Sequence, residues 1–491
     1  MRNAFFRLAL GLATLLMLAG CKVGPEYTRP SVPVAPAWKE QPPWRVASPQ
    51  DSIPKGNWWT IFGDDELNRY EDQAVKANQT IEAARFQLEE ARASARITQS
   101  GLFPQLSAGV TAQRTRTSQN QPTASGVPLA SPITSNGFLV PFNMSWEADV
   151  FGGVRRNVES ANAAYQSSAA SLENARLLVT SDLAADYFNL RELDAEIAVV
   201  DSAVQYQQKA LDLVNNRHAG GVASGLDVAQ QETQLSATRT QATLLRNQRT
   251  QFEHAIAALE GVPASTFSIP SKALALEPPV IPTGVPSDVL ERRPDVAQEE
   301  RLMAAQNAQI GVAKSAFFPS IGINAGGGFN SSDIGALVNF PSVFWALGAN
   351  VTQTLLSGGR RRAQVDFANS AYGVSVANYR QSVLTAFQEV EDGISGLNIL
   401  SQAAGTQQQA VDAAQRALNI ANDRYVGGLV TYLDVVTAEQ TLLDNQRLAV
   451  QLLGQRMVTS VSLIKALGGG WDASSLQAVH VNTTIQQALQ P

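Results

Sequence analysis

The chain has 491 residues, of which 16% are charged, and a formal net charge of −6. Residues 1–20 hold two arginines and no acid, so the remaining chain has 35 basic against 43 acidic residues, a balance of −8. An acidic chain does not favour nucleic-acid binding, which requires a basic face. After residue 20, no stretch approaches 18 uninterrupted apolar residues, so the sequence predicts no transmembrane helix.

The N-terminus has the pattern of a bacterial lipoprotein signal. Arg2 and Arg7 precede an apolar segment, residues 8–18, that is too short to span a bilayer. The tetrad that ends at Cys21 resembles a lipobox, which predicts removal of residues 1–20 and acylation of Cys21. The alternative is an ordinary secretory signal that ends near a cysteine. Cys21 is the single cysteine, so no disulfide is possible within one chain.

Residues 21–63 are predicted to form an extended strap. Eight prolines between Pro25 and Pro54 forbid long helices here. Four tryptophans, Trp38, Trp44, Trp58 and Trp59, give the strap apolar surface with which to dock on a folded body. The alternative is a disordered linker.

Two similar halves follow. The motif from Gly220 to Val228 recurs from Gly427 to Val435, an offset of 207 residues, and Arg217 recurs as Arg424. Such a repeat is typical of a chain built from two related units. Each copy lies between two long helical patterns, so each is predicted to be the tip of a helical hairpin. The expected units are residues 64–265 and residues 287–470, joined by a linker over 266–286 and followed by a tail over 471–491.

Each half is predicted to contain a helix, a β-hairpin and a long helical hairpin. In the first half these are a helix over 64–101, a β-hairpin over 104–150, a long helix over 152–216, a tip over 217–228 and a return over 225–260. In the second they are a helix over 287–316, a β-hairpin over 320–357, a second long helix, a tip over 424–435 and a return over 432–467. A heptad stripe that includes Tyr165 and its counterpart Tyr372 predicts coiled-coil packing. About 65 helical residues span roughly 100 Å.

The strand-like segments alternate apolar and polar residues with period two, over 106–115, 138–150, 321–330 and 343–355. Each is long enough to cross an outer membrane when tilted. The alternative is a soluble sandwich with one wet face. Four strands cannot close an open membrane barrel, so the chain is expected to oligomerise, and this reasoning allows a dimer or a larger ring. The residues expected to face the lumen are Asn143, Ser145, Glu147, Asp149, Asn350, Thr352 and Thr354.

The chain resembles the TolC-type outer-membrane factors, in particular the NodT-type efflux lipoproteins. The motifs that carry the resemblance are the lipobox at 18–21, Val23 to Pro30, Ser145 to Gly152, the two Gly-Gly tips and Leu290 to Asp295. The resemblance covers nearly the whole chain. It implies a mixed α and β fold, with a homotrimeric outer-membrane β-barrel of twelve strands continued by a long periplasmic α-helical barrel. A membrane-fusion adaptor and an inner-membrane pump are the implied partners.

A passive, gated duct for drugs or other small molecules is the predicted function. The sequence has no phosphate-binding Gly-x-x-x-x-Gly-Lys-Ser/Thr loop, so the pump is expected to supply the energy. Catalysis is not predicted, because His218, His254 and His480 are scattered and lack metal-ligand spacing. No cofactor is expected apart from the covalent lipid on Cys21.

The gate and the adaptor contact are both expected at the tips. The gate candidates are Arg424, Tyr425, Leu433, Asp434, Thr437 and Asp227. By resemblance, the adaptor contacts are Gly220, Gly221, Val222, Ser224, Gly427, Gly428, Leu429 and Thr431. Family members often carry Asp at the position of Thr437, which leaves open whether Asp434 replaces it. The alternative role for Arg424 and Asp434 is a helix-end salt bridge of small energy. The four tip glycines are expected to permit a tight reversal with positive φ.

Two other functions are compatible with these patterns. One is an outer-membrane duct for protein or peptide secretion, which a neighbouring exporter gene would distinguish from efflux. The other is a non-conducting coiled-coil lipoprotein that ties the envelope together, which a single-channel conductance measurement would exclude. The sequence names neither the substrates nor the particular pump.

Overall fold

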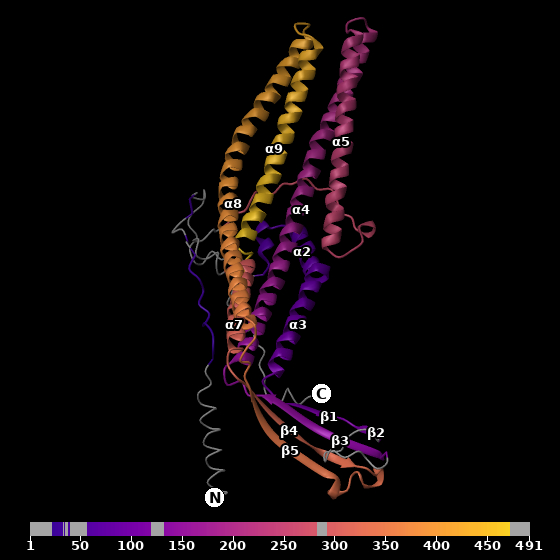
Figure 1. The fold of residues 1–491 in the computed structure, drawn as a ribbon. Coiled ribbons are helices and arrows are strands. Elements are labelled where there is room, and N and C mark those ends of the chain that lie inside the picture. The colour runs from indigo at the N-terminus through magenta and orange to yellow at the C-terminus, as the bar shows by residue number, and fades with distance from the viewer. Residues whose placement is uncertain are drawn as a thin grey trace.

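The computed structural model describes residues 22–32, 34, 38–39, 56–118, 132–281 and 292–471. The molecule is elongated, with long helices at one end and a small antiparallel sheet at the other (Figure 1). Among the described residues, no helix combines the length and the apolar character needed to cross a membrane.

Two helical hairpins form most of the length. The first pairs α4 (Gly153–Ala219) with α5 (Gly225–Leu259), and the second pairs α8 (Arg360–Val426) with α9 (Tyr432–Ala466). The long helices have 67 residues each and the returning helices 35 each. Corresponding helices begin and end 207 residues apart, the same offset as the tip motifs. Figure 1 shows both turns at the end of the body opposite the sheet.

The helix expected over 64–101 is wrong as a single element. It is two helices, α2 (Asp65–Ala77) and α3 (Gln79–Ser100), separated by Asn78 in extended backbone. The Asn78 side chain accepts hydrogen bonds from the backbone N–H groups of Thr80 and Ile81, at 2.8 and 3.2 Å, and so caps α3. Its amide also donates to the carbonyl of Leu259, at 2.8 Å, where α5 ends. A tertiary contact therefore fixes the break.

The helix expected over 287–316 appears as α7 (Pro294–Ser315), which begins with a proline at a position that tolerates one. The expected start at residue 287 lies outside the described residues. The described residues also contain four short 3₁₀ turns: η1 (Trp58–Phe62), η2 (Ala264–Thr266), η3 (Ile334–Ala336) and η4 (Phe340–Ser342).

The sheet contains β1 (Gln105–Ala108), β2 (Thr111–Arg116), β3 (Thr134–Glu147), β4 (Ser320–Ser331) and β5 (Val343–Thr352). Its order is β1-β3-β4-β5, and β2 also pairs with β3. The segment expected as one strand over 106–115 is split into β1 and β2, although both follow one register against β3. The break at Gly109 lies opposite Pro141, which has no N–H to donate to the ladder; Gly109 still donates to the Pro141 carbonyl at 3.0 Å.

The main core lies where α2, α4, α7, α8 and α9 come together, around Trp58, Tyr187 and Tyr379. Trp58 is buried and donates its indole N–H to the hydroxyl of Thr180 at 3.2 Å. Trp38 packs edge-on against Phe387, with ring centroids 6.1 Å apart. These contacts agree with a docked strap at the residues that the structure describes, whereas Trp44 lies outside them.

Candidate functional site

The pairing register gives the sheet one apolar face. Across the strands, Leu106 pairs with Met144, Trp146 with Ile323, and Ala325 with Leu347, so their side chains lie on the same side. The apolar side chains of this face are uncovered in the single chain: Leu106 is 75% exposed, Trp345 81% and Leu347 72%. A large exposed apolar face marks a surface that meets lipid or a partner.

The opposite face is polar and glycine-rich. Five of the seven residues expected in the lumen, namely Asn143, Ser145, Glu147, Asn350 and Thr352, share this face through the register. The Asn324 amide donates to the Asn350 side-chain oxygen at 2.8 Å. Ser145, Glu147 and Asn350 also line a hollow of about 890 Å³ where the sheet meets α3, α4 and α7.

Asp149 and Thr354 do not belong to this face as strand residues, because β3 ends at Glu147 and β5 at Thr352. The Asp149 carboxylate accepts the backbone N–H groups of Val154 and Arg155, at 3.1 and 2.8 Å, and the Arg155 side chain at 3.1 Å. It therefore stabilises the N-terminus of α4, where a negative charge is favourable. The period-two pattern continues past the strand, so sequence reasoning missed this role; the Gly152-Gly153 pair at the helix start was the available signal.

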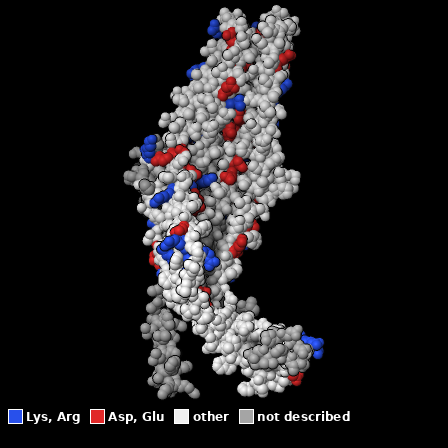
Figure 2. Space-filling model, in the orientation of Figure 1, with Lys and Arg blue, Asp and Glu red and all other residues white. Residues whose placement is uncertain are grey.

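Charged residues are scarce on the sheet. Within the five strands they are Arg114, Arg116 and Glu147. Figure 2 shows Lys, Arg, Asp and Glu spread along the helical part, whereas the visible sheet carries a few only at its far end. The sheet surface is therefore poor in charge, as expected of a surface in a membrane. The helical surface is rich in charge, as expected of a surface in water.

Both tips are closed by the same backbone turn. Val222 N–H donates to the Arg217 carbonyl at 2.8 Å, and Leu429 N–H donates to the Arg424 carbonyl at 2.9 Å. This is the Schellman arrangement, which places a left-handed residue just after the helix. That residue is Gly221, with φ of 76°, or Gly428, with φ of 72°.

The expectation of positive φ is wrong for the other two tip glycines. Gly220 has φ of −79° and Gly427 has φ of −74°, values that any L-residue adopts. A built Cβ at Gly427 would lie 3.4 Å from its nearest neighbour, the Asp423 carbonyl oxygen, which is ordinary contact. Gly220 and Gly427 are therefore not required by the turn itself.

Each returning helix begins with a capping box that uses a predicted gate acid. Asp227 accepts the Ser224 backbone N–H at 2.9 Å, and the Ser224 hydroxyl accepts the Asp227 N–H at 3.2 Å. Asp434 accepts the N–H and the hydroxyl of Thr431, at 3.1 and 2.8 Å. Both carboxylates are thus held on their own helices.

The remaining gate candidates differ in environment. Tyr425 is 9% exposed and packs against Tyr432, with ring centroids 5.0 Å apart, while the Arg217 guanidinium lies over its ring at 4.7 Å. Burial raises the pKa of Tyr425, and Arg217 opposes that shift. Arg424 and Leu433 are exposed. The Thr437 hydroxyl donates to the Leu433 carbonyl of its own helix, at 2.8 Å.

Both tips carry exposed aliphatic side chains. Val222 is 69% exposed, Leu226 65%, Leu429 73% and Leu433 54%. The expected adaptor contacts Ser224 and Thr431 are exposed beside them. Exposed apolar side chains at the tips can pack against the apolar stripe of another protein.

Cys21 lies outside the described residues, but the chain directly after it is firmly held. Val23 N–H donates to the Phe151 carbonyl at 3.2 Å, in the connection from β3 to α4. The buried Arg156 guanidinium donates to the carbonyls of Val23 and Gly24, at 3.1 and 3.2 Å, and pairs with Glu26 at 2.8 Å. The strap therefore begins where the sheet joins the helices. The role of Arg156 was not evident from sequence.

No group of His, Cys, Asp and Glu residues that could hold a metal ion occurs among the residues described by the structure. The Nδ1 atom of His218 lies 2.8 Å from the Ala223 carbonyl oxygen in the first tip, and His480 lies outside the described residues.

Comparison with known proteins agrees with this geometry. The family model "Outer membrane efflux protein" matches residues 71–262 and 285–469, one stretch in each half of the chain. The toluene efflux pump outer membrane protein TtgI of Pseudomonas putida is 30% identical over 471 residues, which cover 95% of this chain and 99% of the relative. The cation efflux system protein CusC of Escherichia coli is 28% identical over 466 residues, covering 94% of this chain and 98% of the relative.

Among solved structures, the CmeC outer membrane channel of Campylobacter jejuni superposes with a TM-score of 0.87. It is 25% identical and the match covers 92% of this chain and 96% of that one. The fold, the sheet with one apolar and one polar face, and the family-model matches in both halves all point to the same family. The chain belongs to the outer membrane efflux protein family and is an outer-membrane efflux channel component.

Proposed function

We propose that three copies of this chain form one continuous, passive duct through the outer membrane and the periplasm, as the exit channel of a tripartite efflux system. The observation that carries the proposal is the sheet, whose apolar face is uncovered and whose polar face carries Asn143, Ser145 and Asn350. Its outer strands, β1 with β2 on one side and β5 on the other, leave edges to which further strands can add.

The number of copies follows from the width of a duct. Eight strands, as two protomers would supply, enclose an interior that side chains fill. Twelve strands from three protomers leave room for a lumen, and all-round pairing removes the open edges. Each protomer then contributes two long hairpins to a helical tunnel below the barrel. The polar face of the sheet lines the lumen and the apolar face meets lipid.

The tips are the proposed docking point for a periplasmic adaptor, and through it for an inner-membrane pump that supplies the energy. Val222, Leu429 and Leu433 offer apolar contacts that a helical hairpin of the adaptor would cover. The gate is proposed at the same end. There, Asp227 and Asp434 shape the backbone through their capping boxes, while Arg424 and Leu433 are exposed.

The proposed anchor is a lipid on Cys21. Support comes from the docking of Val23 and Gly24 beside Phe151, which holds the residues directly after Cys21 where the sheet joins the helices. This is the level at which acyl chains would enter the inner leaflet. Neither a cofactor nor an enzymatic activity is part of the proposal.

The cargo is proposed to be small molecules selected by the pump. The relatives are named for toluene and for cations, two unlike cargoes for one channel type. A water-filled duct needs only sufficient width and a polar wall, so it discriminates weakly between different small molecules.

Deletion of the gene, followed by a drug and solvent susceptibility panel, tests efflux. The deletion strain should become sensitive to several unrelated compounds, and plasmid-borne wild-type chain should restore resistance. Purified protein should elute as a trimer in detergent and conduct ions in a planar bilayer. Loss of secreted protein without any change in susceptibility would favour a secretion duct, and a monomer without conductance would refute the channel.

A further inference from the structure

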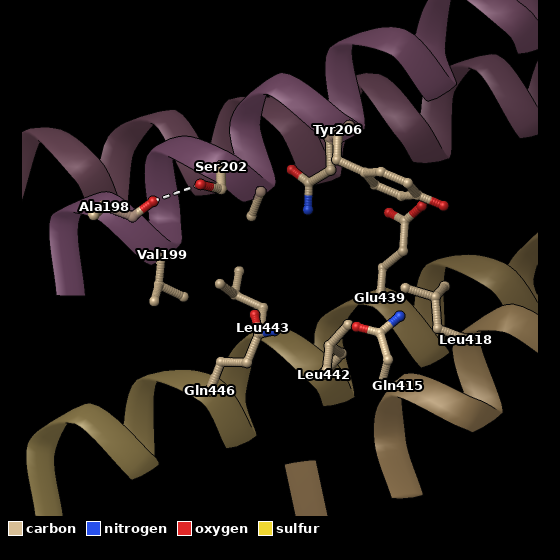
Figure 3. Close-up of a pocket in the computed structure, with 12 residues that line it drawn as sticks. Ala198, Val199, Ser202, Tyr206, Gln415, Leu418, Glu439, Leu442, Leu443 and Gln446 are labelled. Carbon is tan, nitrogen blue, oxygen red and sulfur yellow. Dashed lines mark hydrogen bonds between the residues drawn. The ribbon is translucent and has the colours of Figure 1, made fainter. Parts of the chain in front are cut away.

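A pocket of about 430 Å³ lies between the two helical hairpins. It is lined by α4 of the first hairpin and by α8 and α9 of the second. Figure 3 shows side chains of both hairpins directed into this space. Sites for small organic molecules in proteins usually measure about 300–1,000 Å³. One small ligand could therefore touch both hairpins at once.

Half of the twelve lining residues are aliphatic, and three of the others are the glutamines Gln207, Gln415 and Gln446. Leu418, Leu442 and Leu443 line the pocket and are each less than 10% exposed. Two hydroxyl groups at the pocket already have partners: Ser202 donates to the Ala198 carbonyl at 2.8 Å, and Tyr206 accepts from the Asn422 amide at 2.7 Å. The side-chain oxygen of Gln207, which also lines the pocket, is buried without a hydrogen-bond partner among the described residues.

Glu439 is the one Asp, Glu, Lys or Arg residue in the lining of this pocket. The residue is only 5% exposed, and neither carboxylate oxygen has a hydrogen-bond partner within the part of the chain that the structure describes. Figure 3 shows it reaching from α9 toward Tyr206 of α4. A buried carboxylate without a partner is costly, so this group either stays protonated or requires a cation. Burial raises the pKa of Glu439 to about 7, so both forms are accessible near neutral pH.

The chemistry of the pocket selects among cations. A calcium ion takes six to eight oxygen ligands, commonly with several carboxylates, whereas Glu439 is the one carboxylate in this lining and no metal-binding group of acidic residues occurs among the described residues. An alkylammonium ion needs one carboxylate for its N–H groups and apolar surface for its carbon skeleton. The second description fits Glu439 together with Leu418, Leu442 and Leu443.

We propose that this pocket binds a small lipophilic amine, with its ammonium group paired to Glu439 and its hydrocarbon part packed between the two hairpins. Such a ligand would hold α4 against α8 and α9, and so restrict the movement of one hairpin past the other. The site lies between the helices that form the wall of the proposed tunnel, and all of its lining residues come from one chain.

Calorimetry with the purified full-length protein in detergent tests the site, using cyclohexylamine and cyclohexanol as a charged and a neutral probe of the same shape. The amine should bind at least about tenfold more tightly than the alcohol, because a hydrogen bond to a buried charge is at stake. Glu439→Gln should lower amine affinity about tenfold or more and leave the alcohol unchanged. Glu232→Gln, at an exposed acid of α5, makes the same charge change elsewhere and should alter neither.

A shape variant and a pH series complete the test. Ser202→Leu places a larger side chain at the exposed rim, where folding tolerates it, and should weaken both probes. Amine affinity should rise from pH 6 to pH 8 as Glu439 ionises, since the amine itself stays protonated. The neighbouring titratable groups, Tyr206 of α4 and Tyr432 of α9, have pKa values raised by burial and stay neutral in this range, and α8 contributes the uncharged Gln415. Equal binding of alcohol and amine, or unchanged amine binding by Glu439→Gln, would overturn the proposal.

Discussion

Tyr432 and Gln231 join the two hairpins through a buried hydrogen bond. The Tyr432 hydroxyl, at the start of α9, donates to the side-chain oxygen of Gln231 on α5 at 2.9 Å, and the two residues are 3% and 0% exposed. The Gln231 amide donates in turn to the Gln207 carbonyl on α4, at 2.8 Å. One glutamine therefore connects the second hairpin to both helices of the first, close to the tips.

Replacement of Tyr432 by phenylalanine should loosen this connection. The variant keeps the ring, which packs on Tyr425, but leaves the buried Gln231 oxygen without its donor, at a cost of about 1–3 kcal/mol. Hydrogen exchange should accelerate in the tip ends of both hairpins, with little change at the sheet. Tyr165→Phe, on α4 near the sheet and far from this bond, serves as the control. Unchanged exchange at the tips would mean that the remaining contacts between the hairpins, such as Asn422 with Tyr206 and Arg447 with Glu196, hold them together without this bond.

The docking of the strap depends on Arg156, which is completely buried. Arg156→Lys removes the fork that holds the carbonyls of Val23 and Gly24, and lysine cannot replace several hydrogen bonds in one plane. Residues 22–32 should then become sensitive to protease while the helical core remains intact. The measurement is limited proteolysis followed by mass spectrometry.

A backbone variant gives an independent test of the same docking. Gly24 has φ of 107°, and a built Cβ there would lie 2.5 Å from the Cα of Gly311, so Gly24→Ala cannot fit without displacement. It should release the strap as Arg156→Lys does. Arg85→Lys, at an exposed pair with Glu82, should leave the strap protected. A protected strap in both test variants would contradict the assigned role.

Stability of the helical region should fall as pH rises toward neutrality, partly because of Glu192. Burial and the neighbouring Glu196, whose carboxylate is occupied by Arg447 at 2.7 Å, raise the pKa of Glu192 to about 7. In the unfolded chain the pKa of a glutamate is about 4.3. Between these values the folded state binds more protons, so the stabilisation is fully present at the lower pH and is lost as pH rises through about 7.

Glu192→Gln should therefore reduce this pH dependence. Its thermal midpoint, followed by helical circular dichroism, should exceed that of the wild type by more at pH 8 than at pH 5. Glu232→Gln removes an exposed acid and should give a constant difference. A Glu192→Gln curve parallel to the wild type between pH 5 and pH 8 would show that Glu192 ionises freely in the folded protein.

The repeated elements were accessible from sequence because each depends on local chemistry. A helix end followed by a left-handed glycine is visible in Gly221 and Gly428, and period-two alternation is visible from Phe138 to Trp146. The ends of the strands were harder to predict from sequence. Asp149 continues the period-two pattern of β3, although its carboxylate caps α4.

Features that depend on residues far apart in the chain could not be predicted. The break at Asn78 is fixed in part by the Leu259 carbonyl, and the Tyr432 bond reaches Gln231, 201 residues away. Glu439 illustrates the same limit, since a glutamate in a helical pattern does not reveal whether its carboxylate finds a partner. The packing of α9 with α4 and α8 leaves it buried and, among the described residues, unpaired.

The two glycines of the second tip should respond differently to substitution. Gly427→Ala adds a Cβ where φ is −74° and contacts are ordinary, so both stability and efflux should be retained. Gly428→Ala forces an L-residue to φ of 72° and should cost about 1 kcal/mol, which would be measured as faster hydrogen exchange at the turn.

A bulky residue at Gly427 tests the proposed contact with the adaptor without disturbing the backbone turn. Gly427→Trp places an aromatic ring among the exposed tip side chains that are proposed to meet the adaptor, without requiring a left-handed backbone. The variant should still form trimers in detergent and conduct ions in a bilayer, yet restore no drug resistance to a deletion strain, while Gly427→Ala restores it fully. Because the duct itself stays intact, the loss must arise where the tip meets its partner. Full resistance with Gly427→Trp would mean that the adaptor docks elsewhere on the hairpins.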